Sequence, residues 1–290
     1  GWFFFMQLFG TDERHLDQPS GSIFYTGSFT WEEPVGSRES IDVPGRYDVP
    51  AGTTMVLLTQ LPSDFSATSL AIRSSLQDIR FYIDGVFRVE YSTGGTRLSG
   101  KTSASRYVFC PTSAADAGKE LRIELTTWAH QYSGVVNDNY CGDKANIWHT
   151  IFDRYELETF IAFFILFAGL ATILFSFALG VVYKTSFDRE YLGWCMFMGA
   201  TWVLRESKLR QIFVSNASSL GALCFVMIQL VPVPILFYAD SIQHIQHHRL
   251  YTYLGGIAVL NFAVSALLLI TGTADYIETL PAGLFILAAV

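Results

Sequence analysis

Residues 157–183, LETFIAFFILFAGLATILFSFALGVVY, form an apolar run whose one charged residue, Glu158, lies beside its start. A helix of about 20 apolar residues, rising 1.5 Å per residue, crosses the roughly 30 Å hydrocarbon core of a bilayer. Backbone polar groups find no water in that core, so a single crossing segment has to be helical. The run therefore predicts a transmembrane helix, and it makes the lipid bilayer the first partner of this chain.

Further apolar stretches follow the first, and we expect membrane helices at about 191–206, 217–239, 252–271 and 280–290. The connections between them are short, so neighbouring helices should be antiparallel. Pro232 and Pro234 lack a backbone N–H and predict a kink or a broken turn inside the third helix. Residues 157–290 are thus predicted to form an α-helical polytopic membrane bundle.

Residues 11–156 have a different pattern, with short apolar or alternating runs separated by Gly, Pro, Asp and Ser. In RFYIDGVFRVEY, the pair Asp84-Gly85 lies between two alternating runs and predicts a tight hairpin, because both turn residues need positive φ. Runs of strand length and composition recur through this half: FYTGSFTW, TTMVLLTQL, TSLAIRS, IRFYIDG, VFRVEYS, SRYVFCP and LRIELTTW. Seven or more short strands predict an all-β domain, a β-sandwich or jelly roll.

Orientation follows from the first residues rather than from the loop charges. Residues 1–10 begin GWFFFMQLF, which is too short to cross a bilayer and resembles the end of a signal peptide or anchor helix. A strand-rich domain after such a segment is expected to be extracytoplasmic. The positive-inside rule gives a tie, because three basic residues would lie in the loops on each side. With no initiator Met and an end inside an apolar run, the chain is expected to be part of a longer protein.

Cys110 and Cys141 both lie in the predicted exported half. Disulfides persist in oxidising compartments, so these two residues are a disulfide candidate. Two buried free thiols are the equally weighted alternative. The chain has no CxxC motif and no Cys/His spacing typical of a metal site.

The stretch WVLRESKLRQIF, residues 202–213, concentrates charge in an otherwise apolar half. Our preferred interpretation is an outer elbow capping the second span, in which Glu206 and Arg210 pair at i, i+4 on a continuing helix. The alternative is a polar site within the membrane, because ionisable residues at that depth are usually functional. As an elbow, Arg205, Glu206 and Arg210 become candidates for signal coupling, together with the helix break at Pro232 and Pro234.

Ligand recognition in the exported half has only aromatic candidates. Trp128, Trp148 and Tyr140 have rings that can stack on a sugar or another small extracellular molecule. Aromatic residues in a strand-rich domain are more often core residues, and that interpretation is favoured. A net charge of −7 and a pI near 5.3 exclude nucleic acid as a partner.

Motifs for catalysis, metals and cofactors are missing from the sequence. HIQHH at 244–248 has the form of an HxxHH box, but the chain has 6 histidines in total, too few for the di-iron sites built from such boxes. A polar helix end at the cytoplasmic interface is the simpler interpretation. No P-loop or GxSxG sequence occurs, so no catalytic residue, cofactor or metal is predicted.

Several segments together resemble bacterial seven-transmembrane receptors with diverse intracellular signalling modules, and in particular membrane-bound GGDEF (diguanylate cyclase) proteins. The segments are SLAIRSSLQDIRFYIDGVFRVEY, SASRYVFCPTSAADAGKELRIEL, YCGDKANIW and WVLRESKLRQIFVSN with LVPVPILFY. The resemblance implies a jelly roll that binds an extracellular ligand, for example a carbohydrate, and helices that pass the signal inward. The GGDEF motif is absent from the chain, so cyclase activity and the homodimer natural to it would belong to a longer parent.

Three functions are carried forward from the sequence. The first is the sensory and transmembrane part of such a receptor. The second is a membrane enzyme or transporter with an accessory exported β-domain, for which Gln229 and Asn261 are the polar residues at membrane depth. The third is a membrane-anchored glycan-binding protein, which ranks last because five helices exceed what anchoring needs.

Overall fold

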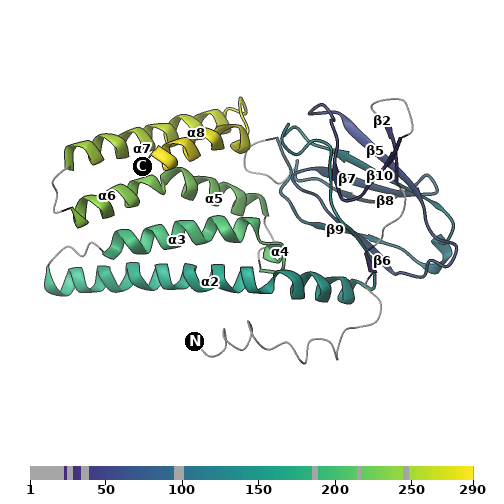
Figure 1. Cartoon of the computed structure of the whole chain (residues 1–290), viewed down its shortest axis with the longest axis horizontal. Helices are drawn as coiled ribbons and strands as arrows, with labels where there is room; N and C mark the ends of the chain where they lie inside the picture. The colour runs from purple at the N-terminus through teal and green to yellow at the C-terminus, as the bar shows by residue number, and fades with distance from the viewer. Residues whose placement is uncertain are drawn as a thin grey trace. The chain divides into compact units, whose positions relative to one another are not determined.

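The computed structural model describes residues 23–24, 29–33, 39–94, 101–184, 189–213, 217–243 and 248–289. The predicted signal or anchor segment at 1–10 lies outside these residues. The chain divides into two compact units: a strand-rich unit that reaches Leu157, and a helical unit of Glu158–Val290 together with the segment Thr93–Ala104. A β-sheet-rich N-terminal part therefore precedes a helical part, as the sequence predicts (Figure 1).

The described residues of the strand-rich unit form two large antiparallel sheets and one small ladder. One sheet has six strands in the order β3-β2-β5-β10-β7-β8, another has four in the order β1-β12-β6-β9, and β11 pairs with β4. The strands are β1 Ile23–Phe24, β2 Phe29–Glu33, β3 Glu39–Ile41, β4 Gly45–Arg46, β5 Thr54–Gln60, β6 Ser69–Arg73, β7 Asp78–Ile83, β8 Val86–Tyr91, β9 Tyr107–Pro111, β10 Glu120–Thr126, β11 Val135–Val136 and β12 Asn139–Gly142.

The β7–β8 hairpin confirms the turn predicted from Asp84-Gly85. Ile83 pairs with Val86, so the turn has two residues, and both have positive φ, 52° at Asp84 and 74° at Gly85. Gly adopts this conformation without steric cost, and Asp tolerates it better than most residues. Local turn chemistry therefore sets the register of β7 and β8 next to the turn, and the pairing shifts by one residue between Tyr82 and Phe81.

One hydrophobic core draws side chains from both large sheets. Leu57, Phe81 and Ile123 come from the six-stranded sheet, whereas Leu70 and Val108 come from the four-stranded sheet, and all are buried. On β10 the burial alternates residue by residue, as expected for a strand with one face toward a core. The apolar alternation read from the sequence thus corresponds to the inward faces of the sheets.

The helical unit consists of helices lying side by side (Figure 1). Among the described residues, three helical segments are long and apolar enough to cross a membrane: Lys144–Tyr183, Leu223–Ile242 and His248–Ile270. The helices are α2 Lys144–Tyr183, α3 Arg189–Glu206, α4 Arg210–Phe213, α5 Ala217–Leu230, α6 Pro232–Ile242, α7 His248–Ile270 and α8 Tyr276–Ala289. Helices occupy all five predicted ranges, and the predicted break occurs at Val231, directly before Pro232.

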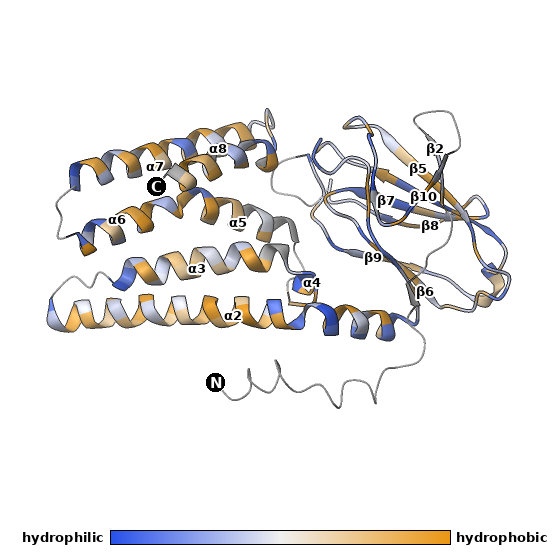
Figure 2. Cartoon of the chain, viewed as in Figure 1, coloured by the Kyte–Doolittle hydropathy of each residue, from blue (hydrophilic) through white to orange (hydrophobic). Residues whose placement is uncertain are grey.

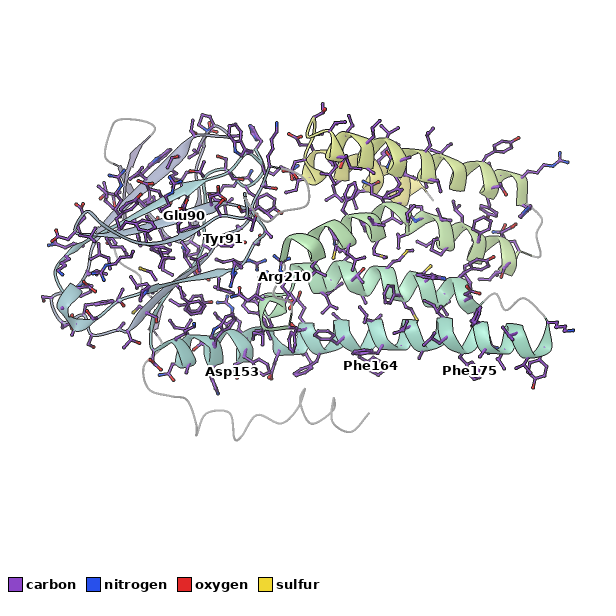
Figure 3. The ribbon with its side chains drawn as sticks, turned by 180° about the vertical axis from the view of Figure 1, so that it is seen from behind. Glu90, Tyr91, Asp153, Phe164, Phe175 and Arg210 are labelled. Atoms are coloured by element: carbon purple, nitrogen blue, oxygen red, sulfur yellow. The ribbon has the colours of Figure 1, made fainter. Side chains whose placement is uncertain are left out.

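The hydropathy of α2 changes at Leu157–Glu158, the boundary between the two units. The first turns are polar on one side, while the residues after Glu158 are mainly apolar (Figure 2). Phe164 and Phe175 project outward from this later part (Figure 3), and both are more than half exposed. Exposed aromatic side chains along a membrane-length helix are typical of a lipid-facing surface.

Candidate functional site

The first turns of α2 form the most extensive functional candidate, because they pack within the strand-rich unit before the helix continues into its apolar part. Ile147 and Ile151, one helical turn apart, are both 0% exposed. The Trp148 ring lies 5.3 Å from Phe109 and 6.1 Å from Tyr107, both on β9. Tyr107 also contacts Tyr140 of β12, with ring centroids 5.9 Å apart. An aromatic cluster therefore joins the start of α2 to two strands of the four-stranded sheet.

Polar contacts fasten the same region. Asp143, directly before α2, accepts a hydrogen bond of 2.9 Å from the Thr68 hydroxyl, and its carbonyl accepts the N–H of Ile147. Arg154 lies 3.7 Å from Asp138 in the turn before β12. Burial raises the pKa of Tyr107 well above its ordinary value, and the neighbouring Tyr140 raises it further. Tyr107 therefore stays neutral in this cluster at physiological pH.

Of the three predicted ligand residues, only Trp128 is largely exposed, whereas Trp148 is partly buried beside Phe109 of β9. Trp128 is 59% exposed, and its ring lies so close to Gly52 that a Cβ there would come within 2.7 Å of it. Gly52 also has a φ of +82°, which favours glycine. Tyr140 is 2% exposed, so its prediction as a ligand contact is wrong. Its burial in the aromatic cluster agrees with the favoured core role.

The predicted disulfide is also wrong, because Cys110 and Cys141 are both free thiols. In the four-stranded sheet, Leu70 of β6 pairs with Cys110 on one side and with Cys141 on the other. Two strand spacings separate the cysteines by about 10 Å, beyond the limit of about 7 Å between the Cα atoms of a disulfide. Burial raises the pKa of Cys110 to about 12, so this thiol stays protonated.

The charged stretch at 202–213 forms an elbow, but not the continuous helix expected. Helix α3 ends at Glu206, so the predicted continuation of one helix from Glu206 through Arg210 is wrong. Ser207 interrupts the helix: its hydroxyl accepts the N–H of Leu209 at 3.2 Å and bonds the Thr159 hydroxyl of α2 at 2.5 Å. Arg210 is buried. The elbow is therefore fastened to α2 one residue after Glu158.

The polar residues at membrane depth are brought together. The Asn261 amide of α7 donates to Oε1 of Gln229 on α5 at 2.6 Å, and the Gln229 amide donates to the Thr279 carbonyl of α8 at 3.4 Å. Gly283 leaves the space that Gln229 occupies, since a Cβ there would clash with Oε1. Interhelical polar contacts of this kind hold membrane helices together. The cluster lies beside the break at Pro232 and Pro234.

Metal binding gains no support from the described residues, which include no group of three or more His, Cys, Asp or Glu side chains placed to hold an ion. His248 from the HIQHH segment instead lies 2.7 Å from the buried carboxylate of Asp240, while His244 lies outside the described residues. This pair connects the end of α6 to the start of α7.

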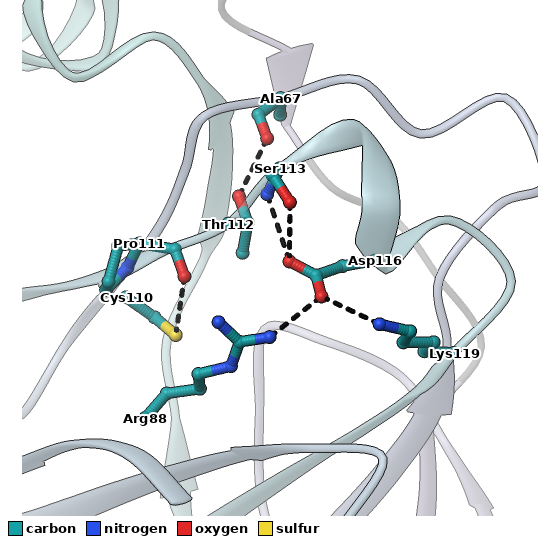
Figure 4. A network of polar contacts seen from close by, with 8 residues as sticks. All are labelled: Ala67, Arg88, Cys110, Pro111, Thr112, Ser113, Asp116 and Lys119. Atoms are coloured by element: carbon teal, nitrogen blue, oxygen red, sulfur yellow. Dashed lines mark hydrogen bonds and ion pairs between the residues drawn. The ribbon is translucent and has the colours of Figure 1, made fainter. Parts of the chain in front are cut away.

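A buried acidic centre in the strand-rich unit was missed from the sequence (Figure 4). Oδ1 of Asp116 contacts Arg88 at 2.8 Å and Lys119 at 3.3 Å, while Oδ2 accepts the N–H of Ser113 at 3.0 Å. The Asp116 side chain is 2% exposed. A Ser-x-x-Asp spacing before a strand, the form of a capping box, was the available signal. The network ties β8 to the turn before β10.

The pH dependence of this centre follows from its partners. Burial alone would raise the pKa of Asp116, but hydrogen bonds from Lys119 and Ser113 and the charge of Arg88 bring it below its ordinary value. Because the folded-state pKa is depressed, the stabilisation is present above the unfolded value of about 3.9 and is lost as pH falls through the folded value.

Asp116→Asn is therefore expected to cost about 1–3 kcal/mol in local stability at pH 7, through loss of charge-assisted bonds. Amide hydrogen exchange of β8 and β10 should show this cost, and the difference from the wild type should shrink as the pH is lowered below the unfolded value of about 3.9. Asp64→Asn, an exposed carboxylate in a loop of the same unit, is the control. A difference that is as large in acid as at pH 7 would contradict a role for the Asp116 charge.

Comparison with known proteins identifies no relative: no protein-family model matches the chain, and neither the curated proteins nor the solved structures contain a significant match.

Proposed function

We propose that this chain is the sensory and transmembrane part of a bacterial signalling receptor, with an exported jelly-roll sensor domain and a cytoplasmic output domain of the diguanylate cyclase type in the parent protein. One observation carries the proposal. The 40 residues of α2 run without a break from turns that pack among the strands into a membrane-length apolar segment. At 1.5 Å per residue, this helix is about 60 Å long.

A continuous helix is suited to carry a displacement because its backbone hydrogen bonds resist bending. The aromatic cluster of Tyr107, Tyr140 and Trp148 fixes the first turns of α2. Beyond the boundary, Thr159 and Ser207 fasten α2 to the elbow after α3. A shift or rotation of α2 would therefore reach α3 through the elbow. A ligand can drive such a shift only by binding one arrangement more tightly than the other.

The ligand class follows from the exposed aromatic surface. Trp128 presents an open ring supported by Gly52. A fixed, exposed indole suits stacking on a sugar ring or another flat small molecule. We therefore propose an extracellular small molecule or carbohydrate as the ligand, with Trp128 as a contact. Cys110 is buried and protonated, and takes no part in recognition.

The coding sequence beyond Val290 tests the proposal directly. Two more membrane helices, then a linker and a GGDEF-type domain, are expected, and the purified parent should convert GTP to a cyclic dinucleotide. A stop codon soon after the last helix would refute the receptor proposal.

Membrane orientation gives a second, independent test on the chain itself. Alkaline phosphatase fused after Gly142, Ser207 or Gly272 should be active, because these positions would lie outside. A fluorescent protein fused after Lys184 or Gln243 should fold and fluoresce, because these positions would lie in the cytoplasm. The reverse pattern would place the strand-rich unit inside the cell and remove its role as an extracellular sensor.

A further inference from the structure

Residues Thr93–Ala104 lie between β8 and β9 in sequence, but they belong to the helical unit by their contacts. The structure describes 93–94 and 101–104 of this segment. Both flanking strands belong to the strand-rich unit. The segment is therefore a second covalent path between the units, separate from α2.

Residues 101 and 102 both bind one carboxylate oxygen. Oδ2 of Asp275, in the turn between α7 and α8, accepts the N–H of Lys101 at 2.8 Å and the N–H of Thr102 at 2.9 Å. The Thr102 hydroxyl donates to the same oxygen at 2.9 Å. Asp275 and Thr102 are each 5% exposed. Hydrogen bonds to a buried ionised acceptor are among the strongest in proteins.

The two ends of the segment are also tied to each other. The N–H of Thr93 donates to the Ser103 hydroxyl at 2.9 Å, and the two hydroxyls lie 3.1 Å apart. Both residues are buried. A movement of either β8 or β9 would therefore displace the Thr93–Ser103 contact, which lies next to Thr102 in the chain.

The hydrogen bonds at the start of α8 leave the Asp275 carboxylate available to bind residues 101–102. Asp275 precedes the helix, a position where an aspartate carboxylate commonly accepts N–H groups of its own first turn. Here Oε2 of Glu278 instead accepts the N–H of Asp275 at 2.8 Å, and the Asp275 carbonyl accepts the N–H groups of Glu278 and Thr279. The carboxylate thus has two alternative sets of donors: residues 101–102, or the first turn of α8.

We propose that Asp275 is a releasable latch, with one state in which its carboxylate holds residues 101–102 and another in which it caps α8. A carboxylate that exchanges between two sets of donors is a two-state element, as switching requires. Residues 101–102 would then control the first turn of α8 independently of α2. The latch rests on the proposed receptor function for its signalling role, but not for its chemistry.

Hydrogen exchange on the 290-residue chain in lipid nanodiscs tests the latch without a ligand. Asp275→Ala should speed exchange of the amides at 101–102 at least tenfold, a factor that corresponds to ~1.4 kcal/mol. It should also speed exchange in the first turn of α8, which loses its alternative cap. Asp275→Asn should have a smaller effect at both places, because its amide oxygen still accepts without the charge.

Two further variants make the result decisive. Thr102→Val removes the hydroxyl but keeps both backbone donors, so it should give a few-fold increase at 101–102 and decides the matter if Asp275→Ala does not fold. Thr273→Ala changes an exposed residue of the same turn and should match the wild type. Unchanged exchange at 101–102 in Asp275→Ala, or in Thr102→Val where the former does not fold, would overturn the latch. Faster exchange at 101–102 with no change in the first turn of α8 would also overturn it, because it would show a fixed contact without a second state.

The latch and the receptor proposal can fail separately. If the exchange pattern appears but the parent lacks an output domain, the latch stands and the signalling role falls. If an output domain is present but Asp275→Ala leaves the segment protected, the receptor proposal stands and coupling must run through α2 alone.

Discussion

Replacing both Ile147 and Ile151 with alanine is expected to release the first turns of α2 from the strand-rich unit. Each side chain is fully buried. An isoleucine-to-alanine change at such a site costs about 2–5 kcal/mol, from lost burial and the cavity left behind. Amide exchange over residues 144–157 and in β9 and β12 should accelerate by several orders of magnitude, while α7 should remain protected.

The control lies on the exposed side of the same turns. The Asp153 side chain, labelled in Figure 3, is 47% exposed and lies 3.0 Å from the exposed His149 ring one turn earlier. Exposed pairs of this type contribute about 0–1 kcal/mol. Asp153→Ala should therefore leave exchange nearly unchanged. In the parent receptor that we propose, the isoleucine double variant should also uncouple ligand binding from output. A full ligand response in that variant would contradict the proposed role of α2.

The second large effect is expected where α2 crosses α3. A Cβ on Gly169 would lie 2.7 Å from the backbone nitrogen of Phe197 and 2.9 Å from the Gly193 carbonyl oxygen. The obstructing atoms are backbone, so side-chain rearrangement cannot relieve the clash. Close approach of two membrane helices at small residues is a common packing mode. Gly169→Leu should separate the helices and cost more than the roughly 1–3 kcal/mol typical of overpacking.

The measurement is the thermal unfolding midpoint of the chain in detergent micelles. It is compared between the wild type, Gly169→Ala and Gly169→Leu, two variants with side chains of increasing size. Gly199→Ala is the matched control, because Gly199 lies on α3 and a Cβ added there would have no atom within 4 Å. Alanine at an open helix position gains about 0.5–1 kcal/mol over glycine. The control should therefore raise the midpoint while the Gly169 variants lower it. A higher midpoint for Gly169→Leu would exclude the tight crossing.

Local patterns in the sequence predicted the elements well. Asp84-Gly85 predicted a two-residue hairpin because positive φ is a property of the turn residues themselves. The apolar run after Glu158 predicted a membrane-length helix. Pro232 predicted the helix break at Val231, the residue that precedes it. Each of these depends on neighbours in the chain.

Spacing alone misled at the elbow and at the cysteines. Glu206 and Arg210 have helical spacing, but the Ser207 hydroxyl bonds the backbone and Thr159, and α3 ends there. Cys110 and Cys141 share one sheet, but β6 lies between their strands. The residue types at Glu206, Arg210, Cys110 and Cys141 do not decide these two results. The segments packed beside them do: α2 contacts the end of α3, and β6 lies between the strands that carry the cysteines.

The sequence by itself therefore determined the division into a strand-rich half and an apolar helical half, since hydrophobic periodicity and length are local properties. Only the tertiary structure decided which polar groups meet: Asp116 with Arg88, Gln229 with Asn261, and Asp275 with Thr102. These partners are separated by 28, 32 and 173 positions in the chain. A buried polar group must find a partner within about 3 Å, and only the folded arrangement specifies which distant residue provides it.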